Sequence, residues 1–105
     1  MTSDNLTIGL EIPLKKIEII PIAERKLKRR GISKEWVKEA IEEPDQIVEG
    51  YGGRKVAHKK YVLGDKEYLL RVVFEEKEGY YSVVTGYLTS QILRYWKEGK
   101  SENRI

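Results

Sequence analysis

The chain has 105 residues, a formal net charge of +3, 40% hydrophobic and 35% charged residues, and no cysteine. This composition fits one globular domain and excludes a disordered tail, a disulfide framework, a cysteine-ligated zinc site and thiol catalysis. No apolar run approaches the roughly 18 residues that span a bilayer, and the N-terminus lacks the pattern of a signal peptide, so we expect a cytoplasmic protein without a membrane partner.

The first part of the chain predicts a strand followed by a helix. The strand is expected over residues 14–20, where polar and apolar residues alternate loosely up to Pro21. The helix begins at Ile22 and ends at Gly31, which suits a left-handed C-terminal cap. Helical spacing places Arg30 at the border of the core.

A second helix and a series of strands come next. Ser33 is a favourable N-cap for a helix with an apolar stripe, and Pro44 ends this helix. Four runs with a period of two predict strands over residues 46–49, 54–63, 67–75 and 80–88. A short helix that folds back on the sheet is expected over residues 89–97, with Thr89 or Ser90 as its cap.

The order of these elements is β-α-α-β-β-β-β, followed by a short C-terminal helix. It predicts an α+β domain in which the two N-terminal helices pack on one face of an antiparallel sheet. We assign residues 1–105 to a single domain with its core over 14–97. Residues 1–13 form an additional strand or a loose arm, and residues 98–105 form a tail.

Strand pairing predicts which side chains share a face. A two-residue turn at Gly64-Asp65 places His58 opposite Arg71, and a second hairpin centred on Lys77 places Arg71 opposite Val83. One face then carries Val56, His58, Lys60, Leu69, Arg71, Val73, Tyr81, Val83, Thr85 and Tyr87. The other, more apolar face carries Ala57, Tyr61, Tyr68, Leu70, Val72, Phe74, Val84 and Leu88. We expect the helices to cover the apolar face and leave the first face for function; a slip of one residue would exchange the faces of a strand.

Charged residues are unevenly distributed. Five cations fall within residues 25–30 and four within 54–60, whereas acidic residues gather in 39–45 and 75–78. This pattern suits an anionic partner, either nucleic acid or an acidic protein segment. The alternative is a solvated surface crossed by salt bridges.

Several short motifs also occur in a characteristic order. They are Ile19-Ile20-Pro21, Ala23, Arg30-Gly31-Ile32-Ser33, Pro44, the run 51–57, Leu70-Arg71-Val72-Val73, Val83-Val84-Thr85, the run 87–91 and Arg94-Tyr95-Trp96. Over residues 16–96 the chain resembles a family of short prokaryotic domains of unknown function placed near the RelE, ParE and BrnT toxins. The resemblance implies a RelE/ParE-like fold and cleavage of RNA, such as messenger RNA on a ribosome, without metal or cofactor and with an antitoxin protein as partner.

The resemblance also implies roles for individual residues. Cleavage needs a group that takes the 2′-hydroxyl proton, cations for the phosphate, and an acid for the leaving oxygen. Lys60 or His58 would act as base or acid, Arg71 and Lys55 would hold the phosphate, and Tyr87 would stack on a base or donate a proton. Further RNA contacts are expected from Lys26, Arg30, Arg54, Lys55, Thr85, Arg94 and Tyr95.

The chain departs from the family pattern at its first helix. Members commonly have a His-Ala pair at the start of this helix and an arginine in its middle, where this chain has Ile22 and Lys26. The protein is therefore either a ribonuclease, degenerate if that histidine is catalytic, or a noncatalytic module that binds RNA or a protein through the same face. The cations beside His58 disfavour its protonated form, which suits a base.

Some of these residues have structural alternatives. His58 in a strand flanked by cations is otherwise a surface residue. Arg30 would otherwise pair with a carboxylate such as Glu24 or Glu35, and Arg71 would otherwise be a structural cation on the open face.

Overall fold

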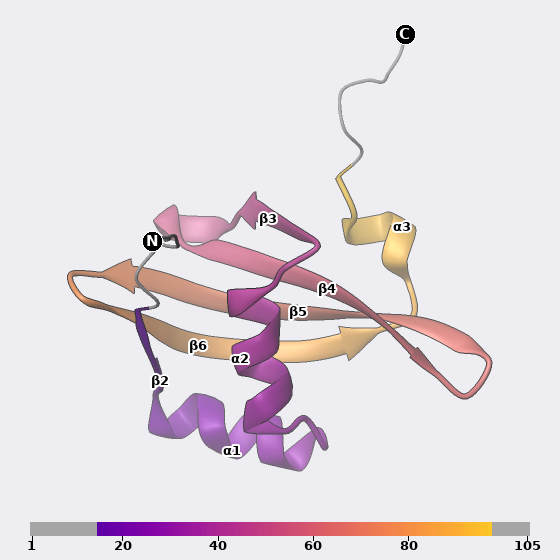
Figure 1. Ribbon diagram of the computed structural model, residues 1–105, viewed down its shortest axis with the longest axis horizontal. Helices are drawn as coiled ribbons and strands as arrows, with labels where there is room; N and C mark the ends of the chain where they lie inside the picture. Colours follow the sequence, from indigo (N-terminus) through magenta and orange to yellow (C-terminus); the bar gives the residue numbers. More distant parts are fainter. Residues whose placement is uncertain (1–14, 98–105) are drawn as a thin grey trace, which may run out of the picture.

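The computed structural model describes residues 15–97, which form an α+β fold (Figure 1). The elements are β2 (Lys16–Ile19), α1 (Pro21–Arg29), α2 (Lys34–Glu42), β3 (Gln46–Glu49), a 3-10 turn (Tyr51–Gly53), β4 (Lys55–Leu63), β5 (Lys66–Lys77), β6 (Tyr80–Thr89) and α3 (Ile92–Tyr95). The predicted class and element order are confirmed. The expectations for residues 1–13, for Leu14 and for 98–105 lie outside the described residues.

The five strands form one sheet in the order β2-β6-β5-β4-β3. The predicted antiparallel sheet is wrong at one edge, because β2 pairs in parallel with β6 while the other neighbours are antiparallel. This pairing joins residues 16–19 to residues 80–83, and the alternation of side chains along a strand carries no information about direction. The sheet is therefore mixed.

Local sequence signals explain both N-terminal helices. Pro21 occupies the first turn of α1, where its missing N–H costs no hydrogen bond. Gly31 follows the helix with a φ of 72°, and the N–H of Ile32 donates to the carbonyl of Leu27 at 2.9 Å. At the start of α2 the Ser33 hydroxyl accepts a hydrogen bond from the backbone N–H of Trp36 at 3.1 Å, as predicted.

The hydrophobic core joins α1 and α2 to the central strands, and Figure 1 shows α2 crossing over them. Its buried members are Leu27, Ile32, Val37, Ala40, Ile41, Ala57, Leu70, Val72, Phe74 and Val83. Trp36 stacks on Tyr61 with ring centroids 4.3 Å apart. Within residues 15–97 no helix is long and apolar enough to cross a membrane.

The predicted register of the first hairpin is confirmed, whereas that of the second is wrong. His58 lies opposite Arg71 as expected. Arg71, however, lies opposite Tyr87 instead of Val83, an offset of four residues. The turn pairs Lys77 with Tyr80 and includes Gly79, whose φ of 87° allows a tight reversal, so the hairpin closes later along the chain than one centred on Lys77. This shift accounts for three residues of the offset, and a β-bulge accounts for the fourth.

A β-bulge changes which side chains of β6 face the core. Phe74 pairs with Val83 and Val73 pairs with Thr85, so Val84 is the additional residue. The extra residue turns Val83 into the core, together with Tyr81, which packs against it. The prediction that these two side chains share a face with Arg71 is therefore wrong, because the bulge interrupts the alternation of side chains along β6.

The C-terminal helix is shorter than predicted. It comprises Ile92–Tyr95, with Gln91 at the N-cap position and no side-chain capping bond. Thr89 ends β6 instead of capping the helix, and its hydroxyl accepts a hydrogen bond from the Gln91 N–H at 3.0 Å. Figure 1 shows α3 beyond the end of β6, apart from the other two helices.

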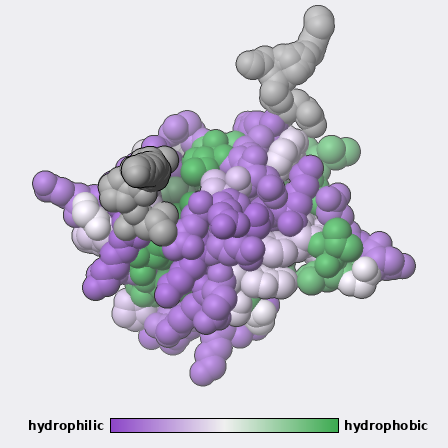
Figure 2. Space-filling view, in the orientation of Figure 1, coloured by the Kyte–Doolittle hydropathy of each residue, from purple (hydrophilic) through white to green (hydrophobic). Residues whose placement is uncertain are grey.

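The surface on the side of α2 is mostly hydrophilic (Figure 2). Apolar side chains gather at the end of the molecule where Figure 1 places the β4–β5 hairpin. Val62 and Leu63 of this hairpin are 68% and 39% exposed.

Candidate functional site

Four polar side chains from four neighbouring strands form one row across the sheet, which we name the Arg71 row. Gln46 of β3 lies opposite His58 of β4, His58 lies opposite Arg71 of β5, and Arg71 lies opposite Tyr87 of β6. Opposed residues in a sheet share a face, and this face is opposite the hydrophobic core. The structure thus brings together three of the four residues expected to be catalytic.

Hydrogen bonds connect the row from end to end. The Nε of Arg71 donates to Nε2 of His58 at 3.0 Å, and Nη1 of Arg71 donates to the Tyr87 hydroxyl. On the other side, Nδ1 of His58 lies 3.0 Å from Oε1 of Gln46. Arg71 is therefore held by two neutral groups.

His58 is a buried, neutral member of this row. Its side chain is 0% exposed, and burial, together with the positive charges of Arg71 and Lys97, lowers the pKa of His58 to about 4. Both ring nitrogens are engaged within the protein. The expected role of His58 as a base or acid toward RNA does not fit this geometry, and neither does the alternative of a surface residue.

The C-terminal end of the described chain covers the row. The Tyr95 ring centroid lies 4.2 Å from Cζ of Arg71, and the Trp96 ring stacks on His58 at a centroid distance of 6.2 Å. The ammonium group of Lys60 lies 4.0 Å from the centroid of Trp96. Lys60 and Tyr95, both predicted site residues, therefore border the row, and Trp96 joins them.

Arg71 differs in its partners from Arg54 and Lys55, two cations at the start of β4. Arg54 pairs with Glu75 at 2.9 Å and Lys55 pairs with Glu76 at 3.3 Å. No carboxylate within residues 15–97 makes an ion pair with Arg71. A half-buried guanidinium with neutral partners suits an external anion, whereas Arg54 and Lys55, predicted to bind RNA, are already paired.

The other predicted RNA contacts lie outside the row. Arg30 donates to the Gly86 carbonyl at 2.8 Å and to the Thr85 hydroxyl at 3.4 Å, along the part of β6 beyond its pairing with β2. The alternative of an ion pair with Glu24 or Glu35 is therefore wrong. Lys26 belongs to α1, and Arg94 of α3 donates to Gln91 at 3.1 Å.

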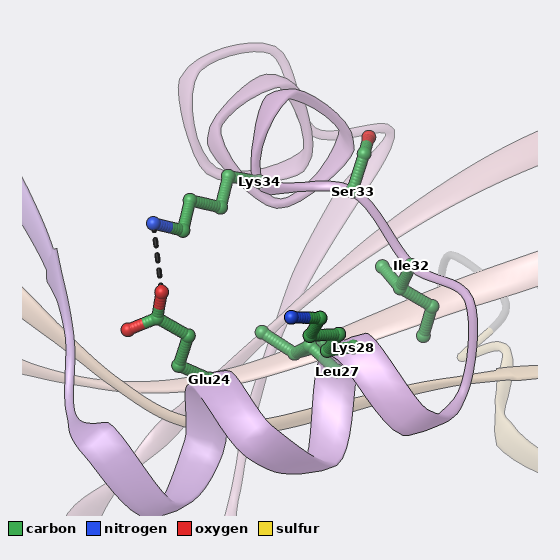
Figure 3. Close-up of a pocket in the computed structure, with 6 residues that line it drawn as sticks. All are labelled: Glu24, Leu27, Lys28, Ile32, Ser33 and Lys34. Atoms are coloured by element: carbon green, nitrogen blue, oxygen red, sulfur yellow. Dashed lines mark ion pairs between the residues drawn. The ribbon is translucent and has the colours of Figure 1, made fainter.

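A separate pocket lies where α1 meets α2 (Figure 3). Its lining residues are Glu24, Leu27, Lys28, Ile32, Ser33 and Lys34. Glu24 and Lys34 form an ion pair of 2.8 Å between the two helices. None of these residues was predicted to belong to a functional site. Across residues 15–97 no three histidine, aspartate or glutamate side chains gather as a metal site would require.

Sequence reasoning missed Gln46 and Trp96 as members of the site. Gln46 is the first residue of a four-residue strand, and pairing that strand with β4 would have placed it opposite His58. Trp96 was predicted to lie on a helix that folds back on the sheet, but the strand pattern does not indicate which side chains such a helix covers.

A family model described as a domain of unknown function (DUF4258) matches residues 23–87. The chain belongs to this family. The matched segment of this DUF4258 domain contains the whole Arg71 row and ends before Tyr95 and Trp96. Comparisons with curated proteins and with solved structures gave no significant match.

Proposed function

We propose that this DUF4258 domain binds single-stranded RNA through the Arg71 row, with Arg71 contacting a phosphate group. The supporting observation is that Arg71 is oriented by His58 and Tyr87 and has no carboxylate partner within residues 15–97. A guanidinium carries five N–H donors, and these two contacts use two of them. The remaining donors suit the paired oxygens of a phosphate.

The surroundings of Arg71 favour RNA over an isolated anion. Tyr87 belongs to the row, and Tyr95 and Trp96 border it. Aromatic rings next to cations are typical of surfaces on which the bases of a single strand stack. Lys60 adds a second cation, which is exposed, beside Trp96. An RNA strand with one phosphate bound to Arg71 and a neighbouring phosphate near Lys60 would run along this face.

Metal-independent cleavage of RNA by a RelE/ParE-like fold is the second candidate function. The Tyr87 hydroxyl accepts a hydrogen bond from Arg71 through its oxygen, which leaves its O–H available to donate to a leaving oxygen. Ribosome-bound messenger RNA and an antitoxin protein would then be the partners. We rank this second because the one histidine of the chain is neutral, buried and bonded on both nitrogens.

The binding proposal is tested with a labelled single-stranded RNA at salt concentrations between about 50 and 200 mM. Arg71→Gln should weaken binding about tenfold and lower the slope of log affinity against log salt by about 0.7, as for the loss of one phosphate contact. Arg54→Gln is the matched control, because it removes the same charge from a residue already paired with Glu75. Equal losses in the two variants would show that net charge alone drives binding and would contradict the proposal.

The same proteins separate binding from cleavage. Each is incubated with a mixed RNA pool, with and without ribosomes and with EDTA present, and new RNA ends are mapped by sequencing. Cyclic-phosphate ends that disappear in Arg71→Gln would establish cleavage at this face. Binding without new ends would establish the noncatalytic module.

A further inference from the structure

We propose that Gln46 and His58 are positioning residues that hold the Arg71 guanidinium ready for a phosphate, and that the backbone of Lys97 sets the orientation of Gln46. The inference rests on the proposed RNA-binding function and deepens it by naming what organises the site. It follows from a chain of hydrogen bonds that runs from the end of the described chain to Arg71.

The first step joins Lys97 to Gln46. The backbone N–H of Lys97 donates to Oε1 of Gln46 at 3.0 Å, and Nε2 of Gln46 donates to the Lys97 carbonyl at 2.5 Å. A flipped amide would place its NH2 group against the N–H and its oxygen against the carbonyl. The Lys97 backbone therefore accepts only the amide orientation that presents Oε1 to His58.

The second step fixes the tautomer of His58. Because Oε1 of Gln46 is an acceptor, Nδ1 of His58 must carry the proton across the 3.0 Å contact. Nε2 then has a free lone pair and accepts the N–H of Arg71 at 3.0 Å. In the opposite tautomer, the N–H at Nε2 of His58 would point at the N–H of Arg71. The lone pair of Nδ1 would then point at the oxygen of Gln46.

The third step fixes the guanidinium itself. His58 holds Nε, Tyr87 holds Nη1, and the Tyr95 ring lies over Cζ at 4.2 Å. Constraining a binding group before the ligand arrives reduces the entropy lost on binding. Gln46 and His58 thus act through Arg71 and do not contact the phosphate.

Nitrogen NMR of the imidazole tests the network directly, because the chain has one histidine. We expect the neutral tautomer with its proton on Nδ1 at pH 7, and a titration well below 6.5, near the pKa of about 4. A proton on Nε2, or an imidazolium at pH 7, would overturn the inference. This readout needs no RNA, so it stays decisive even where the proposed function fails.

Gln46→Glu separates positioning from a general structural role. A carboxylate facing Nδ1 stabilises the imidazolium and raises the pKa of His58 above its wild-type value. Protonated His58 cannot accept from Arg71, so the RNA affinity of the variant should fall several-fold from pH 8 to the pH at which NMR shows its His58 protonated, while wild-type affinity at that pH is unchanged. The other charged or titratable groups around His58 are Arg71, Lys97, Lys60, Asp45, Tyr87 and Tyr95.

The sign of this change is diagnostic. Protonation of a histidine beside RNA ordinarily strengthens binding through the added positive charge. A Gln46→Glu protein that binds RNA as tightly, or more tightly, at the pH where NMR shows His58 protonated than at pH 8 would overturn the positioning role. Thermal unfolding of each variant confirms that the fold is retained at both pH values.

Lys97→Pro and Lys97→Ala test the first step as a matched pair. Both remove the lysine charge, but only proline removes the backbone N–H that donates to Gln46. Trp96 has a ψ of 128°, an extended conformation that a following proline accepts. We expect Lys97→Pro to weaken RNA binding several-fold more than Lys97→Ala and to shift the imidazole signals; identical behaviour would overturn the role of Lys97. Absent RNA binding with the expected tautomer would instead refute the proposed function alone.

Discussion

The buried imidazole of His58 makes the stability of the fold depend on pH. Its pKa is 6.5 in the unfolded chain and about 4 in the folded protein, lowered first by burial and then by Arg71. Because the folded pKa is depressed, the stabilising contribution is present above pH 6.5 and is lost as the pH falls toward 4. From pH 7 to pH 5 we expect the free energy of unfolding, measured with urea, to fall by about 2 kcal/mol.

His58→Gln provides the control for this pH dependence. The amide keeps polar contacts but has no titration between pH 5 and 7, so the variant should show a much smaller loss over that range. The carboxylates of Glu24, Glu75 and Glu76 have pKa values lowered by neighbouring cations and remain charged there. Equal losses in both proteins would refute the assignment of the pH dependence to His58.

At the same scale, the sequence located the central contact of the site but not its chemistry. Counting from the Gly64-Asp65 turn placed His58 opposite Arg71 because a two-residue turn determines register by arithmetic. The burial of His58 was out of reach, since it depends on Trp96 covering the sheet from a segment 38 residues away along the chain. Because His58 is buried, its imidazole stays neutral and accepts a hydrogen bond from Arg71.

Among the elements, α1 approaches β6 closely at Gly86. A Cβ at this position would lie 3.0 Å from Cδ2 of Leu27 and 3.3 Å from the Arg71 carbonyl. Gly86→Ala should therefore push α1 away from the sheet and lower the free energy of unfolding by about 1 to 3 kcal/mol. Chemical denaturation of wild type and variant measures this loss.

A double-mutant cycle with Leu27→Ala tests the proposed clash. When residue 27 is alanine, the methyl group added at position 86 has room. Gly86→Ala should therefore lower the free energy of unfolding less in the Leu27→Ala protein than in the wild-type chain. Additive effects would show that the cost arises from the strand itself and not from the packing of α1 on β6.

The helices and the first hairpin could be predicted because local sequence signals determine them. The pairing between distant strands could not be predicted in this way. Ser33, Gly31 and the two-residue turn each specify their own structure through a cap or a positive φ. The parallel pairing of β2 and the bulge at Val84 depend on partners far along the chain or on an inserted residue, which periodicity does not reveal. Because of the bulge, the side chain of Val83 faces the core, whereas Arg71 and Tyr87 remain on the other face.

Across the whole molecule, charge is separated into paired and solvent-facing groups. The cations Arg54 and Lys55, at the start of β4, are neutralised by Glu75 and Glu76. Within residues 15–97 the exposed Arg25 and Arg29 of α1 form no ion pair. We infer that α1 contributes to the long-range attraction of RNA, whereas Arg71 contributes to its retention.

The double variant Arg25→Gln/Arg29→Gln tests this division by stopped-flow kinetics. Charges that act at a distance raise the association rate and are screened by salt, because the Debye length is about 14 Å at 50 mM and near 7 Å at 200 mM. We expect the double variant to bind RNA more slowly at 50 mM salt, by about two- to fivefold, with an unchanged dissociation rate and a smaller effect at 200 mM.

Arg71→Gln is the comparison variant, and it should instead raise the dissociation rate at both salt concentrations. A faster dissociation in the α1 variant would place RNA on α1 itself and would refute the assignment of the binding surface to the Arg71 row alone.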